Sequence, residues 1–254
     1  MKKKHNAAIV ILAARIPLLF RVISRLQSNW NNKYNYPIYI HTFGNLIDNN
    51  LKKKIKDTFK TEIFFFQVET ALPTHFSEKE IFYNRNYLNY VSKAFPKKRV
   101  GYLHMCYFKT NITKFGFKGC LNEKLKKYSK LLFYDDDNDL EKKIEFDFFD
   151  YAINYPIVTG FTSKRRNDEE HRDITQNLWK FYSNYIKNNN LKPIDIKLNS
   201  AIINNNENVI YDLEYSCGTF EIYNLELINN THWENYLDNV NLYGGNYKYR
   251  WGDM

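Results

Sequence analysis

Apolar residues follow two alternating patterns in the first part of the chain. Residues 7–14 (AAIVILAA) are a continuous apolar run of strand length, as expected for a strand that is covered on both faces of a sheet. From Leu18 to Trp30 the apolar residues recur with a helical period, with polar residues between them. The next predicted elements are a strand at Pro37–Thr42, a helix at Leu51–Phe59 and a strand at Thr61–Gln67. This β-α-β-α-β order predicts a parallel sheet with right-handed crossovers.

The rest of the chain predicts more helices and two short strands. Helices are expected at Glu78–Ala94, Arg99–Thr110, Thr175–Asn188 and Thr231–Val240, and strands at Lys130–Tyr134 and Ile157–Thr162. No internal repeat and no linker rich in Gly, Pro or Ser divides the sequence. We therefore expect one α/β domain over residues 1–254, Rossmann-like, with a mainly parallel central sheet.

The charge of the chain narrows the range of partners only slightly. The formal net charge is +9, from 37 Lys and Arg against 28 Asp and Glu, which favours anionic partners such as nucleic acid, anionic lipid or phosphorylated small molecules. The basic residues are spread along the chain in short runs such as Lys52–Lys54, a distribution that solubility alone explains. We therefore expect no specific binding of nucleic acid.

Cysteine content and the N-terminus indicate the compartment. The three cysteines form no C-x-x-C pair, and an odd number is a poor disulfide framework, so a reducing cytosol is the simpler environment. The apolar run at residues 7–14 is too short for a membrane span, and Arg15 follows it at once. We expect no transmembrane segment and a soluble, cytoplasmic protein. Abundant Asn, Lys, Ile and Tyr suggest an AT-rich genome, such as that of a virus or protist.

The clearest chemical signal is the strand KLLFY, which ends directly in Asp135, Asp136 and Asp137. Ligands of open α/β sheets gather at the carboxyl ends of strands. Asp135 and Asp137 are two residues apart, so they would point to one side and could share a divalent cation with a nucleotide diphosphate. The alternative is a solvated acidic turn, since Asp139 and Glu141 continue the acidity.

Three other segments carry weaker signals. Glu221 lies among apolar residues and is either a functional carboxylate or an edge carboxylate that faces water. Residues 250–253 (RWGD) combine charge, an aromatic ring and a glycine, which suits sugar binding but also an ordinary tail. The run from His104 to Cys106 could suggest a soft metal site. Since no second Cys or His lies at ligand spacing, a buried helix face explains it better.

Taken together, these segments resemble the fungal-type GDP-mannose-dependent α-1,2-mannosyltransferases, in order along nearly the whole chain. The resembling segments are Asn31–Pro37 (NNKYNYP, family N-N/K-K-F/Y-x-Y-P), Gly101–Phe108 (GYLHMCYF, family Y-R-H-M-C-R-F), Lys126–Phe149 (family K-K-Y-D-Y-Y-W-R-V-E-P-D), Tyr211–Ile222 (YDLEYSCGTFEI, family Y-N-x-C-H-F-W-S-N-F-E-I) and Gly244–Asp253 (GGNYKYRWGD, family G-G-F-F-Y-E-R-W-G-D). The third alignment has no gap and places Asp135 and Asp137 on the two acids of E-P-D.

The resemblance implies a GT-A-type fold and a retaining transfer of mannose. GDP-mannose would be the donor, a mannose or related sugar hydroxyl of a glycan the acceptor, and Mn²⁺ or Mg²⁺ the metal, bound by Asp135 and Asp137. Arg15 and Tyr102 would contact the nucleotide together with these aspartates.

The resemblance also assigns roles to two residues of the C-terminal part. Glu221 would be the nucleophile, or would stabilise positive charge at the anomeric carbon during a same-face transfer. Asp253 would orient the hydroxyls of the acceptor. The chain ends at Met254, before the A-P-V-H-S segment of the family, so we expect a C-terminally short version without the membrane anchor of the family.

The chain departs from the family pattern at several arginines. Leu103 and Tyr107 stand where Y-R-H-M-C-R-F has Arg, and Phe133 replaces the Arg before E-P-D. These departures leave an alternative from another class, a degenerate α/β protein that binds a glycan or polyanion without catalysis. A metal-dependent nuclease that uses the three aspartates is a third possibility, which only the charge and the acids support.

Overall fold

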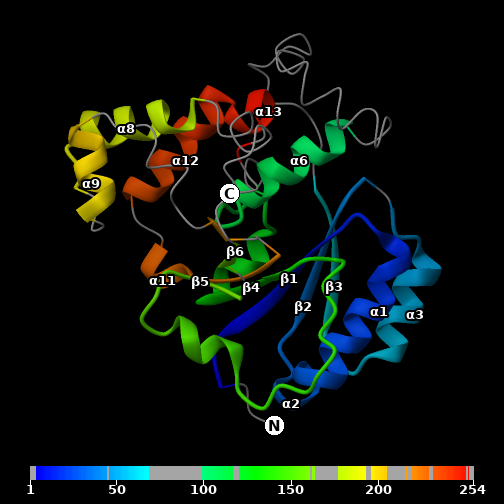
Figure 1. Cartoon of the computed structure of the whole chain (residues 1–254). Helices are drawn as coiled ribbons and strands as arrows, with labels where there is room; N and C mark the ends of the chain where they lie inside the picture. Colours follow the sequence, from blue (N-terminus) through cyan, green and yellow to red (C-terminus); the bar gives the residue numbers. More distant parts are fainter. Residues whose placement is uncertain are drawn as a thin grey trace. The chain divides into compact units, whose positions relative to one another are not determined.

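The computed structural model describes most of the chain as two compact units. The described residues are 4–44, 46–68, 99–116, 120–160, 162–163, 177–192, 196–204, 215–216, 219–228, 231–249 and 251. The first unit comprises residues 1–71, 111–161 and 218–231, and the second comprises residues 72–110, 162–217 and 232–254. Figure 1 shows the chain coloured along its sequence.

A six-stranded sheet is the centre of the first unit. Its strand order is β3-β2-β1-β4-β8-β5. The strands are β1 (Ala7–Ala13), β2 (Ile38–Phe43), β3 (Ile63–Val68), β4 (Lys130–Tyr134), β5 (Ile157–Thr159) and β8 (Phe220–Asn224). The pairs among β1, β2, β3 and β4 are parallel, whereas β8 pairs antiparallel with both β4 and β5. The prediction of an α/β fold with a mainly parallel central sheet is confirmed.

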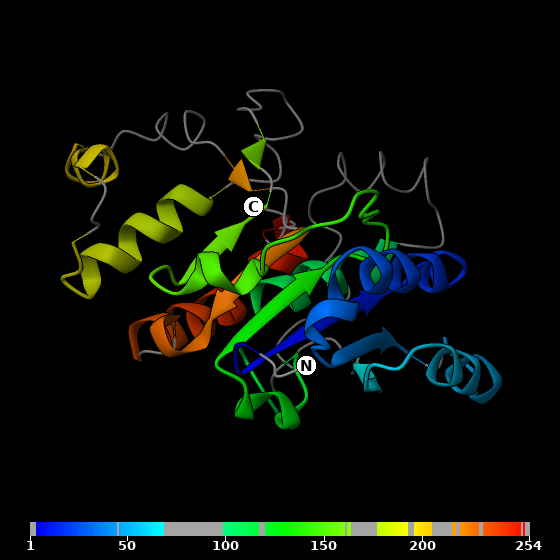
Figure 2. The same cartoon turned by 90° about the horizontal axis from the view of Figure 1, so that it is seen from below.

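The apolar pattern of β1 follows from its central position. Every residue of β1 is buried, and the strand lies between β2 and β4. One face packs against α1 (Ile16–Leu26), whose buried positions Leu19, Ile23 and Leu26 follow the predicted helical period. Helix α3 (Asn49–Thr58) begins at the N-cap Asp48 and lies next to α1 in both views (Figures 1 and 2).

The segment NNKYNYP forms the turn that leads into β2. Helix α1 continues into a π-helical turn, η1 (Gln27–Asn31), and a short helix, α2 (Asn32–Tyr34). The buried Asn31 amide donates to the carbonyl of Tyr36 (2.8 Å), and its Oδ1 accepts from the Tyr36 backbone N–H (2.9 Å). This pair of hydrogen bonds satisfies buried backbone groups and fixes the entry of the chain into β2.

The predicted strand at Ile157–Thr162 is wrong in its length. Strand β5 ends at Thr159, and the Gly160 N–H then donates to the carbonyl of Phe220 (3.0 Å). Further along, β6 (Thr162–Ser163) pairs with β7 (Tyr215–Ser216) in a separate two-stranded sheet of the second unit. The apolar run therefore contributes to two sheets, which its composition does not indicate.

Helices dominate the described part of the second unit. They are α6 (Arg99–Thr110), α8 (Leu178–Asn188), α9 (Ile196–Ile203), α12 (Thr231–Tyr243) and α13 (Gly245–Tyr249). The predicted helix at Glu78–Ala94 lies outside the described residues. Within the described ranges, no helix combines the length and apolarity needed to cross a membrane.

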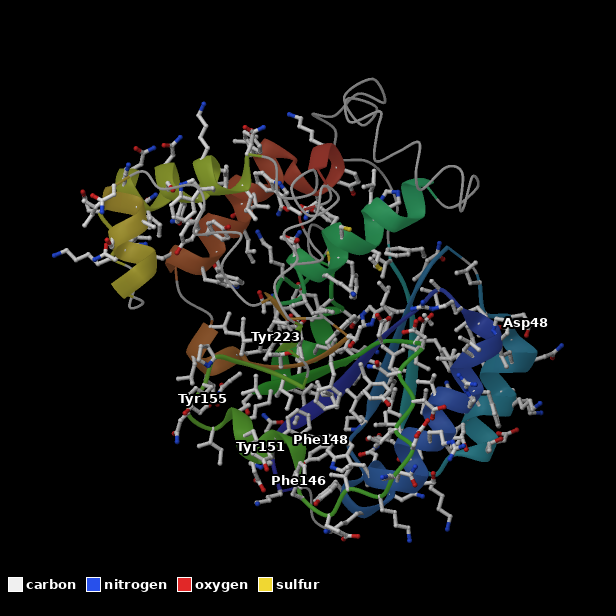
Figure 3. The ribbon with its side chains drawn as sticks, in the orientation of Figure 1. Asp48, Phe146, Phe148, Tyr151, Tyr155 and Tyr223 are labelled. Atoms are coloured by element: carbon white, nitrogen blue, oxygen red, sulfur yellow. The ribbon has the colours of Figure 1, made fainter. Side chains whose placement is uncertain are left out.

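Among its described residues, the first unit has three more short helical elements, which lie outside the strands of the sheet. They are the 3-10 helices η2 (Glu123–Lys127) and η3 (Phe148–Ala152), and the helix α11 (Leu225–Ile228). Asp147 caps η3 by accepting a hydrogen bond from the N–H of Phe149 (3.1 Å). Phe148, which Figure 3 labels, then packs against the core ring of Trp30 at 4.4 Å between centroids.

Candidate functional site

The carboxyl end of β4 is fixed to the start of β8. Strand β4 is buried throughout, and the three aspartates follow it directly. The N–H of Asp135 donates to the carbonyl of Thr219 (2.9 Å), which continues the β4–β8 ladder by one bond. Asn138 also donates its side-chain amide to the Thr219 carbonyl, and its N–H donates to the carbonyl of Asp135 (3.2 Å). The turn that carries the aspartates is therefore held in place rather than solvated on all sides.

Asp136 is the buried member of the aspartate trio (Asp135, Asp136 and Asp137). Its side chain is 1% exposed. One carboxylate oxygen accepts from the backbone N–H groups of Ala14 (2.6 Å) and Arg15 (2.5 Å), and the other accepts from Arg15 Nε (2.7 Å). These bonds satisfy a buried charge and tie the end of β4 to the turn between β1 and α1.

The guanidinium of Arg15 contacts all three aspartates. Arg15 Nη2 lies 2.7 Å from Asp136 and 3.5 Å from Asp135, and Nη1 lies 2.6 Å from Asp137. Partial burial lowers the pKa of Arg15, but the hydrogen bond from Asp136 and the three carboxylate charges outweigh it and raise the pKa above its ordinary value. The predicted nucleotide-binding arginine and the predicted metal ligands thus meet at one point of the first unit.

The trio has the donor chemistry of a site for a hard divalent cation. One oxygen from each carboxylate lies within 4.8 Å of the other two. Among the described residues, the trio is the group of three acidic, His or Cys side chains that lie close enough together to hold one metal ion. Asp136 is buried and bonded to both the Arg15 side chain and the backbone, so Asp135 and Asp137 would be the ligands of a cation. Mn²⁺ and Mg²⁺ favour a few carboxylates and complete their coordination with phosphate oxygens and water, so these residues fit either metal.

Glu221 lies on β8, between β4 and β5, and not on an edge strand of the sheet. It pairs with Phe133 on β4 and with Thr159 on β5. Two residues further along the β4–β8 pair, the N–H of Asp135 donates to the carbonyl of Thr219. Glu221 is therefore two residues away from the start of the aspartate trio along this pair of strands. Residues that alternate along a strand share a face, which places Glu221 on the side of the sheet opposite Ile222 and its core cluster. The sequence separates Glu221 from the trio by more than 80 positions, and the fold brings them to neighbouring strands.

Tyr223 holds the carboxylate of Glu221. Its hydroxyl donates to Glu221 Oε2 at 2.5 Å, across the two-residue spacing of one strand face. Burial and the charge of Glu221 raise the pKa of Tyr223 well above its ordinary value, so the hydroxyl stays protonated and remains a donor. Figure 3 labels Tyr223 among the side chains of the sheet.

The remaining predicted residues belong to the second unit. Tyr102 lies on α6, but its side chain is outside the described part of the structure, as is the whole of Asp253. On the same helix, Leu103 and Tyr107 pack against Tyr247. Where the family pattern has arginines, this helix therefore makes apolar contacts.

The run from His104 to Cys106 is a buried helix face, as the spacing predicted. His104 is 8% exposed and Cys106 is fully buried. His104 Nδ1 lies 3.2 Å from the Tyr247 hydroxyl, and burial lowers the pKa of the imidazole. These contacts join α6 to α13 within the second unit and give His104 a structural environment.

Sequence reasoning missed the roles of Asp136 and Tyr223. Asp136 was only the middle residue of an acidic run, because nothing local indicates that its carboxylate reaches a turn some 120 positions earlier. Tyr223 carried a usable signal, since a residue two positions after Glu221 in a strand must share its face.

The sequence is similar to one described family along its whole length and to individual mannosyltransferases of fungi. The family model described as glycolipid 2-alpha-mannosyltransferase matches residues 1–254. The chain is 26% identical over 258 residues to the "Probable mannosyltransferase MNT3" of Candida albicans, and 23% identical over 258 residues to the "O-glycoside alpha-1,2-mannosyltransferase omh1" of Schizosaccharomyces pombe. These alignments cover 98% and 99% of this chain but 63% of either relative. The chain therefore spans less than two thirds of the length of these curated relatives.

Two solved structures share the fold. Core-mannan synthase A (CmsA/Ktr4) from Aspergillus fumigatus, in a Mn/GDP form, matches with a TM-score of 0.73 at 17% identity, over 99% of this chain and 68% of the other. The mannosyltransferase Ktr4p from Saccharomyces cerevisiae, in complex with GDP, also matches with a TM-score of 0.73, at 18% identity, over 98% of this chain and 64% of the other. The predicted GT-A-type fold is thereby confirmed. Because the family model matches the whole sequence, this chain belongs to the glycolipid 2-alpha-mannosyltransferase family.

Proposed function

We propose that this protein is a retaining mannosyltransferase, which moves mannose from GDP-mannose to a hydroxyl of mannose or a related sugar. The observation that carries the proposal is the meeting of Arg15, the aspartate trio and the strand of Glu221 at the carboxyl end of β4. Ligands of α/β sheets bind at this edge. Family membership supports the reaction, and the Mn/GDP form of core-mannan synthase A supports the donor and the metal.

Asp135 and Asp137 would hold Mn²⁺ or Mg²⁺ in this proposal. When bound, the cation would supply positive charge that neutralises the departing diphosphate. The chain contributes the placement of the two carboxylates, because the Asp135 N–H is fixed to Thr219 and Asp136 is anchored below the turn. A backbone held in this way keeps both carboxylates close to the metal, so little reorganisation is needed once the metal and the nucleotide are bound.

Arg15 would bind a phosphate oxygen of the nucleotide. A guanidinium presents its donors in a rigid fork that suits phosphate, and it keeps its charge at any physiological pH. Asp136 holds Nε and Nη2 of Arg15 from behind, so the side chain does not need to be ordered when the nucleotide arrives.

Glu221 would act on the sugar rather than on the diphosphate. Its negative charge favours an oxocarbenium-like transition state, either by attack on the anomeric carbon or by electrostatic stabilisation of a same-face transfer. The hydrogen bond from Tyr223 orients the carboxylate for either role. In the second unit, Asp253 would orient the acceptor.

Calorimetry of GDP binding tests the metal and donor assignment. GDP should bind with Mn²⁺ present, and Asp137→Ala should weaken binding about tenfold or more, because diphosphate charge is left without its full counter-charge. Asp150→Ala is the matched control, an aspartate of the same unit whose carboxylate contacts Lys4 and His5, and its GDP affinity should equal that of the wild type.

A transfer assay across GDP-, UDP- and CMP-sugars tests the reaction itself. We expect turnover with GDP-mannose and a sugar acceptor, and none after EDTA treatment. Equal GDP affinity with and without EDTA would remove the metal assignment. GDP binding without any transfer would instead identify a degenerate binding protein.

A further inference from the structure

We propose that Arg15 and the divalent cation are alternative counter-ions of Asp137, and that Asp136 is the positioning residue that keeps Arg15 in place during the exchange. The inference rests on the proposed function, because it takes Asp137 as a metal ligand. It goes further by assigning a role to Asp136 and by coupling metal binding to nucleotide binding through one side chain.

The two contacts of Arg15 differ in burial. The anchoring partner, Asp136, is 1% exposed and accepts from Nε and Nη2 of the guanidinium. Asp137 is 42% exposed and contacts Nη1 at 2.6 Å. Charge-assisted bonds to a buried carboxylate are stronger than those to an exposed one, which competes with water and salt. The contact with Asp137 is therefore the exchangeable one.

The rigid geometry of the Arg15 guanidinium indicates that Asp137, and not Arg15, moves in the exchange. A guanidinium is planar and rigid, so the position of Nη1 is fixed once Nε and Nη2 are held by Asp136. Asp137 meets Nη1 through Oδ2 at 2.6 Å, so a cation bound on the same side would lie next to the positive charge of Arg15 and be repelled by it. In the proposed exchange, the exposed side chain of Asp137 turns away from Arg15 when it binds a metal, which relieves this repulsion.

The same movement frees a donor of Arg15. With Asp137 turned to the cation, the N–H groups of Nη1 lose their carboxylate and point to the edge of the sheet where the diphosphate would lie. A phosphate oxygen can then replace the lost partner. Metal binding to Asp137 and phosphate binding to Arg15 would thus favour each other, as linked equilibria require.

The anchor is a departure of this chain from the pattern that it resembles. In the segment E-P-D the middle residue is proline, which has no carboxylate, whereas this chain has Asp136 at that position. The hydrogen bonds from Ala14, from the Arg15 backbone and from its guanidinium therefore depend on a side chain that the pattern does not supply.

Mn²⁺ binding without nucleotide tests the exchange, measured by calorimetry or by electron paramagnetic resonance of free Mn²⁺. Arg15→Gln should bind Mn²⁺ about fivefold more tightly than the wild type, because the competing cation is gone. Arg21→Gln is the matched control. Arg21 lies on α1, just after the turn that carries Arg15, and is half-exposed. It pairs with Asp139 at 3.8 Å, so its loss should leave Mn²⁺ affinity within about twofold.

A double-mutant cycle on GDP affinity tests the role of Asp136. Arg15→Gln and Asp136→Asn should each weaken GDP binding in Mn²⁺, by about fivefold, and the double variant should be no weaker than either single variant. Additive losses in variants with wild-type circular dichroism would show that Asp136 acts independently of Arg15. If Asp136→Asn does not fold, the comparison of Arg15→Gln with Arg21→Gln still decides the exchange.

The outcomes separate this inference from the proposed function. If Asp137→Ala abolishes Mn²⁺ binding while Arg15→Gln binds Mn²⁺ as the wild type does, the exchange is wrong and the metal site stands. If Arg15→Gln and Arg21→Gln tighten Mn²⁺ binding equally, only general charge is at work and the exchange is again wrong. If the wild type binds neither Mn²⁺ nor GDP, the proposed function fails and the inference falls with it.

Discussion

Two groups of aspartates lie in the first unit, and they differ in whether their carboxylates share one partner or have separate partners. In the aspartate trio, three carboxylates share the guanidinium of Arg15 within a radius of a few ångströms. In the second group, Asp147 accepts from the Tyr36 hydroxyl at 2.6 Å, and Asp150 accepts from Lys4 at 2.6 Å and contacts His5 at 2.8 Å. Each carboxylate of the second group therefore has partners of its own.

The difference indicates which group serves stability. Asp147 is 2% exposed, caps η3 and ties it to Tyr36 before β2, so its bonds join distant parts of the core. Like charges crowded at one strand end cost stability, because the negatively charged carboxylates repel one another. Such crowding is typical of sites that bind a cation. We therefore expect substitutions in the trio and its neighbours to change activity, and substitutions in the second group to change stability.

The largest expected effect is on turnover, in Glu221→Gln. The substitution keeps the volume of the side chain but removes its charge, and a cationic transition state loses more than a neutral ground state does. Turnover should fall about a hundredfold or more while GDP affinity stays unchanged. Steady-state kinetics with GDP-mannose and calorimetry with GDP measure the two quantities.

Tyr223→Phe is the companion variant for Glu221. It leaves the charge of Glu221 in place and removes only the 2.5 Å hydrogen bond that orients it, so its turnover should fall less than that of Glu221→Gln. Wild-type turnover in Glu221→Gln would make Glu221 a structural carboxylate of β8. The catalytic assignment would then be wrong, while the fold would be unaffected.

The sequence predicted elements well where periodicity is local. The apolar run of β1, the helical period of α1 and the strand KLLFY are set by burial of neighbouring residues, and the structure confirms all three. The position of the trio at a strand end followed from the same pattern. The position of Glu221 did not follow from a local pattern, because β8 comes more than 80 residues after β4. Strand β8 also enters the sheet antiparallel, between β4 and β5. No local pattern encodes that pairing, so the placement of Glu221 beside β4 required the structure.

A second expected effect is on stability, in Tyr36→Phe. The buried Asp147 would lose its hydrogen bond from the Tyr36 hydroxyl and retain the N–H of Phe149. We expect the free energy of unfolding in urea to fall by about 1–2 kcal/mol, the cost of leaving part of a buried polar group unsatisfied. Affinity for GDP should not change. A change in GDP affinity at unchanged stability would contradict the division between the two groups of aspartates.

The smallest expected effect is a pH-dependent one, in Asp150→Asn. Partial burial alone would raise the pKa of Asp150, but the hydrogen bonds and charges of Lys4 and His5 outweigh it and hold the pKa below its ordinary value of 3.8. A carboxylate with a lowered folded-state pKa contributes stability above its unfolded-state pKa, and that contribution is lost as the pH falls through the folded-state value. The side chain of Asp150 is 33% exposed, so solvent screening should keep the contribution below about 1 kcal/mol at neutral pH.

Thermal unfolding from pH 7 to pH 3 should therefore show the wild type slightly more stable than Asp150→Asn at neutral pH, with the difference shrinking below about pH 4. Since every other acidic residue is present in both proteins, the difference reports on Asp150 together with its partners Lys4 and His5. A difference that stays constant over this range would mean that the pairing with Lys4 and His5 does not depend on the charge of Asp150, and this group of aspartates would then contribute to stability through neutral hydrogen bonds alone.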